Sequence, residues 1–258
     1  MQALIVGSNK APILDFIPKP GAEPFLILDD GPIIDALDIP AQQKPVHFTP
    51  ELRLNPLQGM DYKKARDFVS VIEAVFPEGD NTLTKKNASF VLLEALLDEP
   101  TYLDKLLRPD KKDAGKQDAY QKIQTLLLSP ILSKVLSQPT NFSMKGIVLA
   151  RLDRAVIGDF DAIVLGSLLI SQFEGQVIVP DGGFYLREHH ISLIRQNRLI
   201  AGVNTLSEVS ERMRQNLLTI PKKIASQATY EDAQVLANYE GIEPRTIRHG
   251  DFIKDAMG

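Results

Sequence analysis

Residues 176–183 read Gln-Val-Ile-Val-Pro-Asp-Gly-Gly, a short apolar run followed by a turn that opens on an acid. Two more stretches place a polar residue after a mostly apolar run: 199–204 read Leu-Ile-Ala-Gly-Val-Asn, and 146–153 read Gly-Ile-Val-Leu-Ala-Arg-Leu-Asp. Runs that are apolar at every position are typical of strands in a parallel sheet that helices cover on both faces. These three stretches therefore predict an α/β fold.

Helical and strand patterns alternate around these runs. Further strands are expected at 2–6, 25–28 and 45–48, and a short one near Ile220. Helical spacing of apolar residues predicts helices at 160–173, 189–196, 207–217 and 230–239. This alternation favours one mostly parallel sheet over a bundle or a sandwich.

The stretch 58–140 has a different pattern, with helical spacing throughout. Helices are expected at 62–75, at 84–97 with Thr84 as its N-cap, at 101–107 with Thr101 as its N-cap, at 120–128 and at 131–136. The charged stretch 108–118 is interpreted as an exposed linker. We therefore predict an all-helical insertion at 58–140 in an α/β core formed by 1–57 and 141–258.

Composition excludes several classes of protein. The 258 residues include no cysteine, which excludes disulfides and thiolate metal sites. The net charge of −4 lacks the basic excess of a free-standing nucleic-acid binder. The longest apolar runs have a length of about ten residues, which is too short to span a bilayer. We expect a cytoplasmic protein with no signal peptide and no membrane segment.

Polar residues and glycine follow several of the predicted strands. Gly7, Asp29, Asp153, Asp181 and Asn204 all stand at such strand ends. In open parallel sheets, ligands bind in the crevice at the carboxyl ends of the strands. A functional site is therefore expected among these residues.

The order of these segments resembles the HerA/FtsK superfamily of P-loop ATPases, especially its TraG-like conjugation members. The resemblance covers nearly the whole chain and implies a RecA-like P-loop NTPase core, mostly parallel, with helices on both faces and an all-helical insertion. The stretches that carry it are 54–57, 82–84, 92–97, 128–130, 138–139, 146–152, 162–169, 177–181, 199–203 and 232–237.

The phosphate loop implied by this resemblance is incomplete. A Walker A loop, G-x-x-x-x-G-K-[ST], wraps phosphates with backbone N–H groups, and its hydroxyl residue holds Mg²⁺. The corresponding residues here are Gly7, Ser8, Asn9, Lys10 and Ala11, which we take as the candidate nucleotide-binding residues. The second glycine is missing and Ala11 replaces the hydroxyl residue. Lys10 is either a phosphate ligand or a solvated loop lysine.

Two catalytic positions of the family are also altered. Asp181 matches the Walker B acid, but Gly182 follows it where the family has a catalytic glutamate. Asn204 matches the polar sensor, which is usually glutamine. We take Asp181 and Asn204 as remnant catalytic residues. The alternatives are that Asp181 caps a turn with Gly182 and Gly183, and that Asn204 has an N-cap or Asx-turn role before Ser207. Together with the incomplete loop, these changes predict lost ATP hydrolysis, with no cofactor expected.

Two other groups of residues have competing interpretations. His189 and His190 are adjacent, so they point in different directions on a helix, and no third ligand follows; we predict no metal site. The richest basic segment either lines a DNA-facing channel or forms solvated helix faces with interspersed glutamates. It contains Arg187, Arg195, Arg198, Arg212 and Arg214.

Three functions follow from these observations. The favoured one is a degenerate ATPase-fold protein that acts as a structural or regulatory subunit of a mobile-element or phage DNA-handling assembly, in a homo- or hetero-oligomer. The first alternative is an active DNA translocase or packaging ATPase, in which Lys10 contacts ATP and Asp181 holds Mg²⁺ through water. The second is an α/β adaptor that binds a protein partner through its helical insertion. The chain opens on the first predicted strand, so we expect it to lack the family's usual N-terminal domain or membrane anchor.

Overall fold

The computed structural model describes residues 2–18, 23–39, 44–76, 82–98, 102–243, 247 and 252–254. The chain forms two compact units. Unit 1 comprises 1–47, 145–151 and 173–258, and unit 2 comprises 48–144 and 152–172. Unit 2 thus contains the whole of the predicted insertion at 58–140 together with flanking residues and 152–172. Whether the domain boundaries lie at 57/58 and 140/141 stays a prediction.

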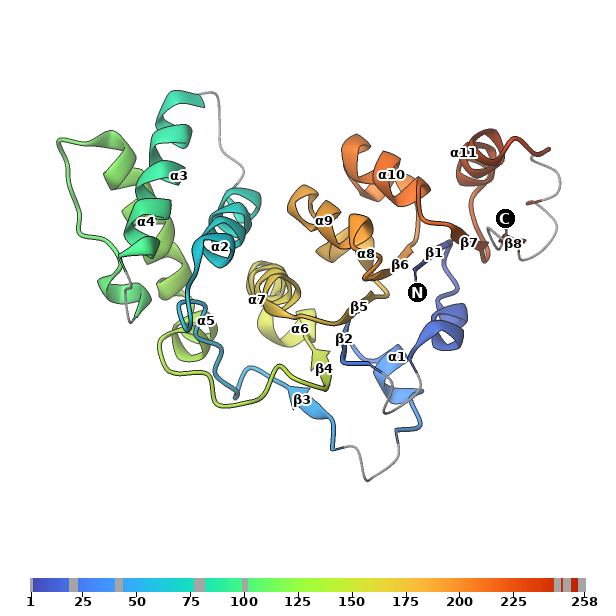
Figure 1. Ribbon diagram of the computed structural model, residues 1–258, viewed down its shortest axis with the longest axis horizontal. Helices are drawn as coiled ribbons and strands as arrows, with labels where there is room; N and C mark the ends of the chain where they lie inside the picture. Colours follow the sequence, from blue (N-terminus) through green and yellow to red (C-terminus); the bar gives the residue numbers. More distant parts are fainter. Residues whose placement is uncertain are drawn as a thin grey trace. The chain divides into compact units, whose positions relative to one another are not determined.

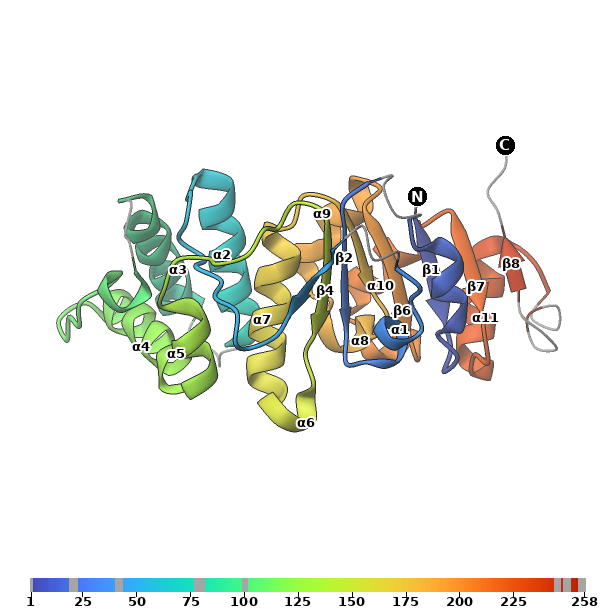
Figure 2. The ribbon, with the colours of Figure 1, turned by 90° about the horizontal axis from the view of Figure 1, so that it is seen from below.

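A single sheet organises unit 1. Its strand order is β3-β4-β2-β5-β6-β1-β7-β8, and the neighbours from β4 to β7 pair in parallel, whereas β8 pairs antiparallel with β7. Figure 2 shows these strands side by side from β4 to β8. Their bounds are β1 Ala3–Val6, β2 Phe25–Asp29, β3 Val46–Phe48, β4 Ile147–Arg151, β5 Gln176–Val179, β6 Leu199–Val203, β7 Lys222–Ala225 and β8 Phe252–Lys254.

Helices cover this sheet on both faces, as predicted. In Figure 1, α8, α9 and α10 lie on one face, and η1 and α1 lie on the other. On the η1 side, alternate strand residues such as Ile5, Ile27 and Ile200 pack against Ile13 and Phe16, because successive side chains of a strand point to opposite faces. The bounds are η1 Ala11–Phe16, α1 Pro32–Asp35, α8 Gly182–Tyr185, η4 Glu188–His190, α9 Ile191–Arg195, η5 Leu206–Glu208, α10 Glu211–Leu218 and α11 Tyr230–Glu240.

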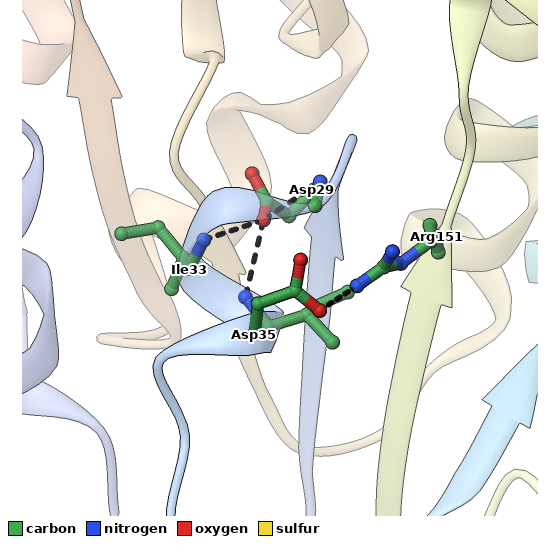
Figure 3. Close-up of polar contacts among 6 residues, drawn as sticks. Asp29, Ile33, Asp35 and Arg151 are labelled. Carbon is green, nitrogen blue, oxygen red and sulfur yellow. Dashed lines mark hydrogen bonds and ion pairs between the residues drawn. The ribbon is translucent and has the colours of Figure 1, made fainter.

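Asp29, one of the predicted strand-end residues, stabilises the turn after β2. One of its carboxylate oxygens accepts the backbone N–H groups of Gly31, Ile33 and Ile34 at 3.1, 2.8 and 3.2 Å (Figure 3). Burial raises the pKa of this carboxyl, while the three hydrogen bonds act in the opposite direction. At the end of the neighbouring strand β4, Arg151 pairs with Asp35 of α1. Asp29 therefore caps the start of α1.

Unit 2 is helical in its described residues. Its helices are α2 Tyr62–Val75, α3 Thr82–Leu97, η3 Leu103–Lys105, α4 Ala114–Leu128, α5 Pro130–Leu136, α6 Arg154–Ile157 and α7 Asp159–Gln172. α2 packs against α7, where Phe76 and Phe160 meet with ring centroids 5.7 Å apart, and α3 packs against α4. At the start of α5, the hydroxyl of Ser129 donates to Asp161 of α7 at 2.5 Å.

Two predicted boundaries in unit 2 were wrong. The expected linker 108–118 is helical from Ala114, because the Asp113 carboxylate caps the helix by accepting the N–H of Lys116. Thr84 lies inside α3, which begins at Thr82, so it cannot be the N-cap. Thr101 lies outside the described residues. Among the residues that are described, none of the helices is both apolar and long enough to traverse a bilayer.

Candidate functional site

The candidate residues of unit 1 meet at one edge of the sheet. β6 pairs with β1 on one side and with β5 on the other, and β1 also pairs with β7. Because these strands are parallel, the residues that follow them lie at the same edge. Gly7, Asp181 and Asn204 follow β1, β5 and β6, so the topology brings the predicted site residues together.

The loop from Gly7 to Ala11, called loop 7–11 below, lies directly against the backbone of its neighbours. Gly7 has a φ of +126°, and a Cβ added there would lie 1.9 Å from the carbonyl oxygen of Ser226. The N–H of Gly7 donates to the carbonyl of Val203 at 2.9 Å, and that of Asn9 points to the carbonyl of Ser226 at 3.5 Å. Only glycine fits at position 7 without moving the chain.

Three side chains of loop 7–11 make hydrogen bonds within the protein. The Lys10 ammonium donates to the carbonyl of Gly7 at 2.6 Å, and the Ser8 hydroxyl donates to Gln227 at 3.0 Å. The side-chain oxygen of Asn9 accepts the N–H of Ala11 at 3.0 Å. The loop then continues into η1, a six-residue 3₁₀ helix.

Three N–H groups and the lysine of loop 7–11 are directed at the protein itself. A phosphate-binding loop needs several backbone N–H groups that point at the anion and a lysine that reaches it. Here the N–H groups of Gly7, Asn9 and Ala11 point to protein oxygens, and the Lys10 ammonium is bound to the loop's own carbonyl.

Lys10 is half-buried and faces acids. Burial lowers the pKa of its ammonium from 10.5 to about 8, although the carboxylates of Glu208, Asp181 and Asp232 act to raise it. The Lys10 stem lies over Gly202 of β6, where an added Cβ would be 2.9 Å from the Lys10 Cδ. The half-buried Lys10 ammonium therefore lies near three carboxylates at this edge of the sheet.

Two glycines follow Asp181, and neither leaves room for a side chain. A Cβ at Gly182 would lie 2.8 Å from the carbonyl oxygen of Gly202, and one at Gly183 would lie 2.3 Å from a carboxylate oxygen of Glu208. The Asp181 carbonyl accepts the N–H groups of Phe184 and Tyr185, so Asp181 opens the short helix α8. The glutamate that the resemblance implies after Asp181 could not stand at position 182 without displacing β6.

Asn204 contributes its backbone to this region. Its side chain is exposed, and its N–H donates to a carboxylate oxygen of Glu208 at 3.1 Å. The alternative role as cap of a helix before Ser207 was wrong, because the next helical turn, η5, has Thr205 at its N-cap position. The longer helix α10 begins only at Glu211 and is capped by Ser210.

Two of the acids near Lys10 were not predicted as site residues. Glu208 lies at the end of η5, and Asp232 lies in the first turn of α11. Asp232 is buried and accepts the N–H of Leu206 at 2.9 Å and the hydroxyl of Thr229 at 2.8 Å. Both residues come near Lys10 because β1, which precedes Lys10, lies between β6 and β7. That strand order carries no local sequence signal.

Most of the basic segment is paired within unit 1. The Arg198 guanidinium donates to the carbonyls of Gly175 and Phe173. Arg187 donates to the carbonyl of Leu186 at 2.9 Å, and burial lowers the pKa of its guanidinium. Arg212 pairs with Glu188, and Arg214 with Glu211, whereas Arg195 is exposed. Four of the five arginines thus have protein acceptors.

The rings of the two histidines contact one another at a tilt of 53°. Their ring centroids lie 3.9 Å apart, and burial lowers the pKa of His189 to about 4, so its ring is neutral at pH 7. Within the described part of the chain, no three His, Cys, Asp or Glu side chains come together as a metal site would require.

Comparison with known proteins identifies the fold. No protein-family model matches the sequence, and no curated protein matches it. Similar solved structures include the unbound bacterial conjugative coupling protein TrwB (TM-score 0.66, 9% identity, 100% of this chain and 82% of that chain). TrwB with ADP and Mg²⁺ has a TM-score of 0.65 and 10% identity, over 100% of this chain and 83% of that chain. VirB4 of Thermoanaerobacter pseudethanolicus has a TM-score of 0.61 and 13% identity, over 100% of this chain and 89% of that chain. The chain therefore has the RecA-like α/β fold of the P-loop NTPases, which confirms at the level of fold the predicted resemblance to TraG-like ATPases.

Proposed function

We propose that this chain is a P-loop-fold protein that does not hydrolyse ATP and acts as a structural or regulatory subunit of a conjugation-type DNA-handling assembly. The observation that carries this proposal is the conformation of loop 7–11. Its lysine is bound to its own backbone, and three of its N–H groups point to protein oxygens. The assembly is suggested by the fold that the chain shares with a conjugative coupling protein.

Two further positions support the loss of hydrolysis. Attack on the γ-phosphate needs a group that orients the water and a metal that neutralises the developing charge. Position 182 has no room for a catalytic side chain, and Ala11 offers no hydroxyl to a metal. Asp181 remains as an acid after β5, with Gly182 in the place of the catalytic glutamate.

A subunit of this kind would act through protein contacts. Strands β1 and β6 are apolar and buried throughout, which supports a fold that needs no bound nucleotide to organise it. Because most arginines of the basic segment are paired within the protein, DNA would be held mainly by other members of the assembly. We propose a cytoplasmic protein that works as a homo- or hetero-oligomer.

An ATP hydrolysis assay on the purified chain tests this proposal. With Mg²⁺ and ATP, and with or without single- and double-stranded DNA, phosphate release is expected at the background rate. Asp181→Ala should leave that rate unchanged, with folding checked by circular dichroism. Turnover that is stimulated by DNA and lost in Asp181→Ala would contradict the proposal and establish the active ATPase, with ATP and Mg²⁺ as its cofactors.

A further inference from the structure

We propose that the negative charge of Glu208, beside a Lys10 that lies back over its own loop, keeps phosphate away from the sheet edge after β1, β5 and β6, so that Glu208 is an autoinhibitory group. This inference rests on the proposed function, because it gives a physical cause for a P-loop fold that takes no nucleotide. It assigns that cause to one residue outside the motifs of the family.

The first of these two side chains, Lys10, lies over β6. Gly202 has no side chain, and the space that a Cβ would need is taken by the Lys10 Cδ at 2.9 Å and the Ile13 Cδ1 at 3.1 Å. The ammonium at the end of this stem donates to the carbonyl of Gly7 at 2.6 Å. Lys10 therefore lies back over its own loop instead of extending toward a ligand.

The second side chain, Glu208, lies over the turn after β5. A Cβ at Gly183 would lie 2.3 Å from a carboxylate oxygen of Glu208 and 2.8 Å from its Cβ. The same carboxylate oxygen accepts the N–H of Asn204 at 3.1 Å. Glu208 thus occupies the space beside the Walker B position, where no side chain of the 182–183 turn can enter.

The two side chains are neighbours, because the turn beneath Glu208 packs against Gly202 through Gly182. A Cβ at Gly182 would lie 2.8 Å from the carbonyl oxygen of Gly202, so the turn beneath Glu208 packs on the strand beneath Lys10. The charged groups that face the Lys10 ammonium are Glu208, Asp181 and Asp232. Three carboxylates repel an entering phosphate and attract the Lys10 ammonium.

Titration of the whole chain with inorganic pyrophosphate at constant ionic strength tests the inference. Glu208→Gln removes the charge and keeps an oxygen that can accept the Asn204 N–H. Wild type should show no binding at millimolar pyrophosphate, whereas Glu208→Gln should bind at least about tenfold more tightly than that limit, since one negative charge is removed at close range. The double variant Lys10→Met/Glu208→Gln should lose the gain.

Glu243→Gln is the matched control, because it removes the same charge beyond the far end of α11, about 15 Å from that helix's first turn. It should not bind pyrophosphate. In Glu208→Gln, the pKa of Lys10 measured by NMR should fall below about 8, because the carboxylate that raises it most is gone.

Each outcome bears on a different claim. An unchanged Lys10 pKa, no gain in Glu208→Gln, or a gain that persists in the double variant would overturn the role of Glu208 and leave the proposed function standing. Tight binding by wild type would overturn the proposed function itself.

Discussion

Gly7→Ala is expected to lower the free energy of unfolding by about 3–5 kcal/mol, as the sum of a strained positive φ and a steric clash. The φ of +126° disfavours any side chain, and the new Cβ would lie 1.9 Å from the Ser226 carbonyl oxygen and 2.9 Å from the backbone nitrogen of Ala228. Since both neighbours are backbone atoms, β1 and the segment after β7 would have to separate. Urea denaturation followed by circular dichroism measures the loss.

Gly146→Ala is the control that separates the two contributions. Gly146 also has a positive φ, +109°, but nothing lies within 4 Å of an added Cβ. Its substitution should therefore cost only the backbone strain, about 1–2 kcal/mol. Equal losses in the two variants would show that loop 7–11 does not lie against the Ser226 backbone.

Lys223→Met is expected to cost about 3–5 kcal/mol, because it leaves a buried carboxylate without its ammonium partner. Lys223 of β7 and Glu240 of α11 pair at 2.7 Å, with only 4% and 7% of their side chains exposed. The Lys223 ammonium also lies 5.0 Å from the centroid of the Tyr239 ring. Chemical denaturation of the whole chain gives the size of the effect.

The double variant Lys223→Met/Glu240→Leu provides the control for this pair. Replacing both charges by apolar groups of similar size removes the desolvation penalty together with the attraction, so most of the stability should return. If the double variant is no more stable than Lys223→Met, the loss comes from packing around position 223 and not from a stranded charge.

The sequence alone predicted the architecture because apolar runs mark strands wherever they are buried on both faces. The runs at 176–180 and 199–203 correspond to β5 and β6. The strand expected near Ile220 begins instead at Lys222. Two adjacent lysines do not have the pattern of a buried strand, and Lys223 is buried here as the partner of Glu240. Local pattern could not show a partner 17 positions further along the chain.

The candidate site was predictable only in part. Strand-end position and the resemblance indicated loop 7–11, Asp181 and Asn204, which the topology brings to one edge of the sheet. Glu208 and Asp232 had no such signal, since their approach to Lys10 depends on the order of β6, β1 and β7. Asp29, in turn, has a strand-end position but serves as a helix cap. The position of a residue after a strand predicts that it lies at this edge of the sheet, whereas its hydrogen bonds and neighbours determine what it does there.

Isothermal titration of the purified chain with ATP and Mg²⁺ tests the central claim most directly, because it asks whether loop 7–11 can hold a triphosphate. No heat of binding is expected up to millimolar ATP, with Lys10→Ala indistinguishable from wild type. Binding in the micromolar range that is abolished by Lys10→Ala would show that the loop opens around phosphates, and would contradict the claim that this P-loop fold takes no nucleotide.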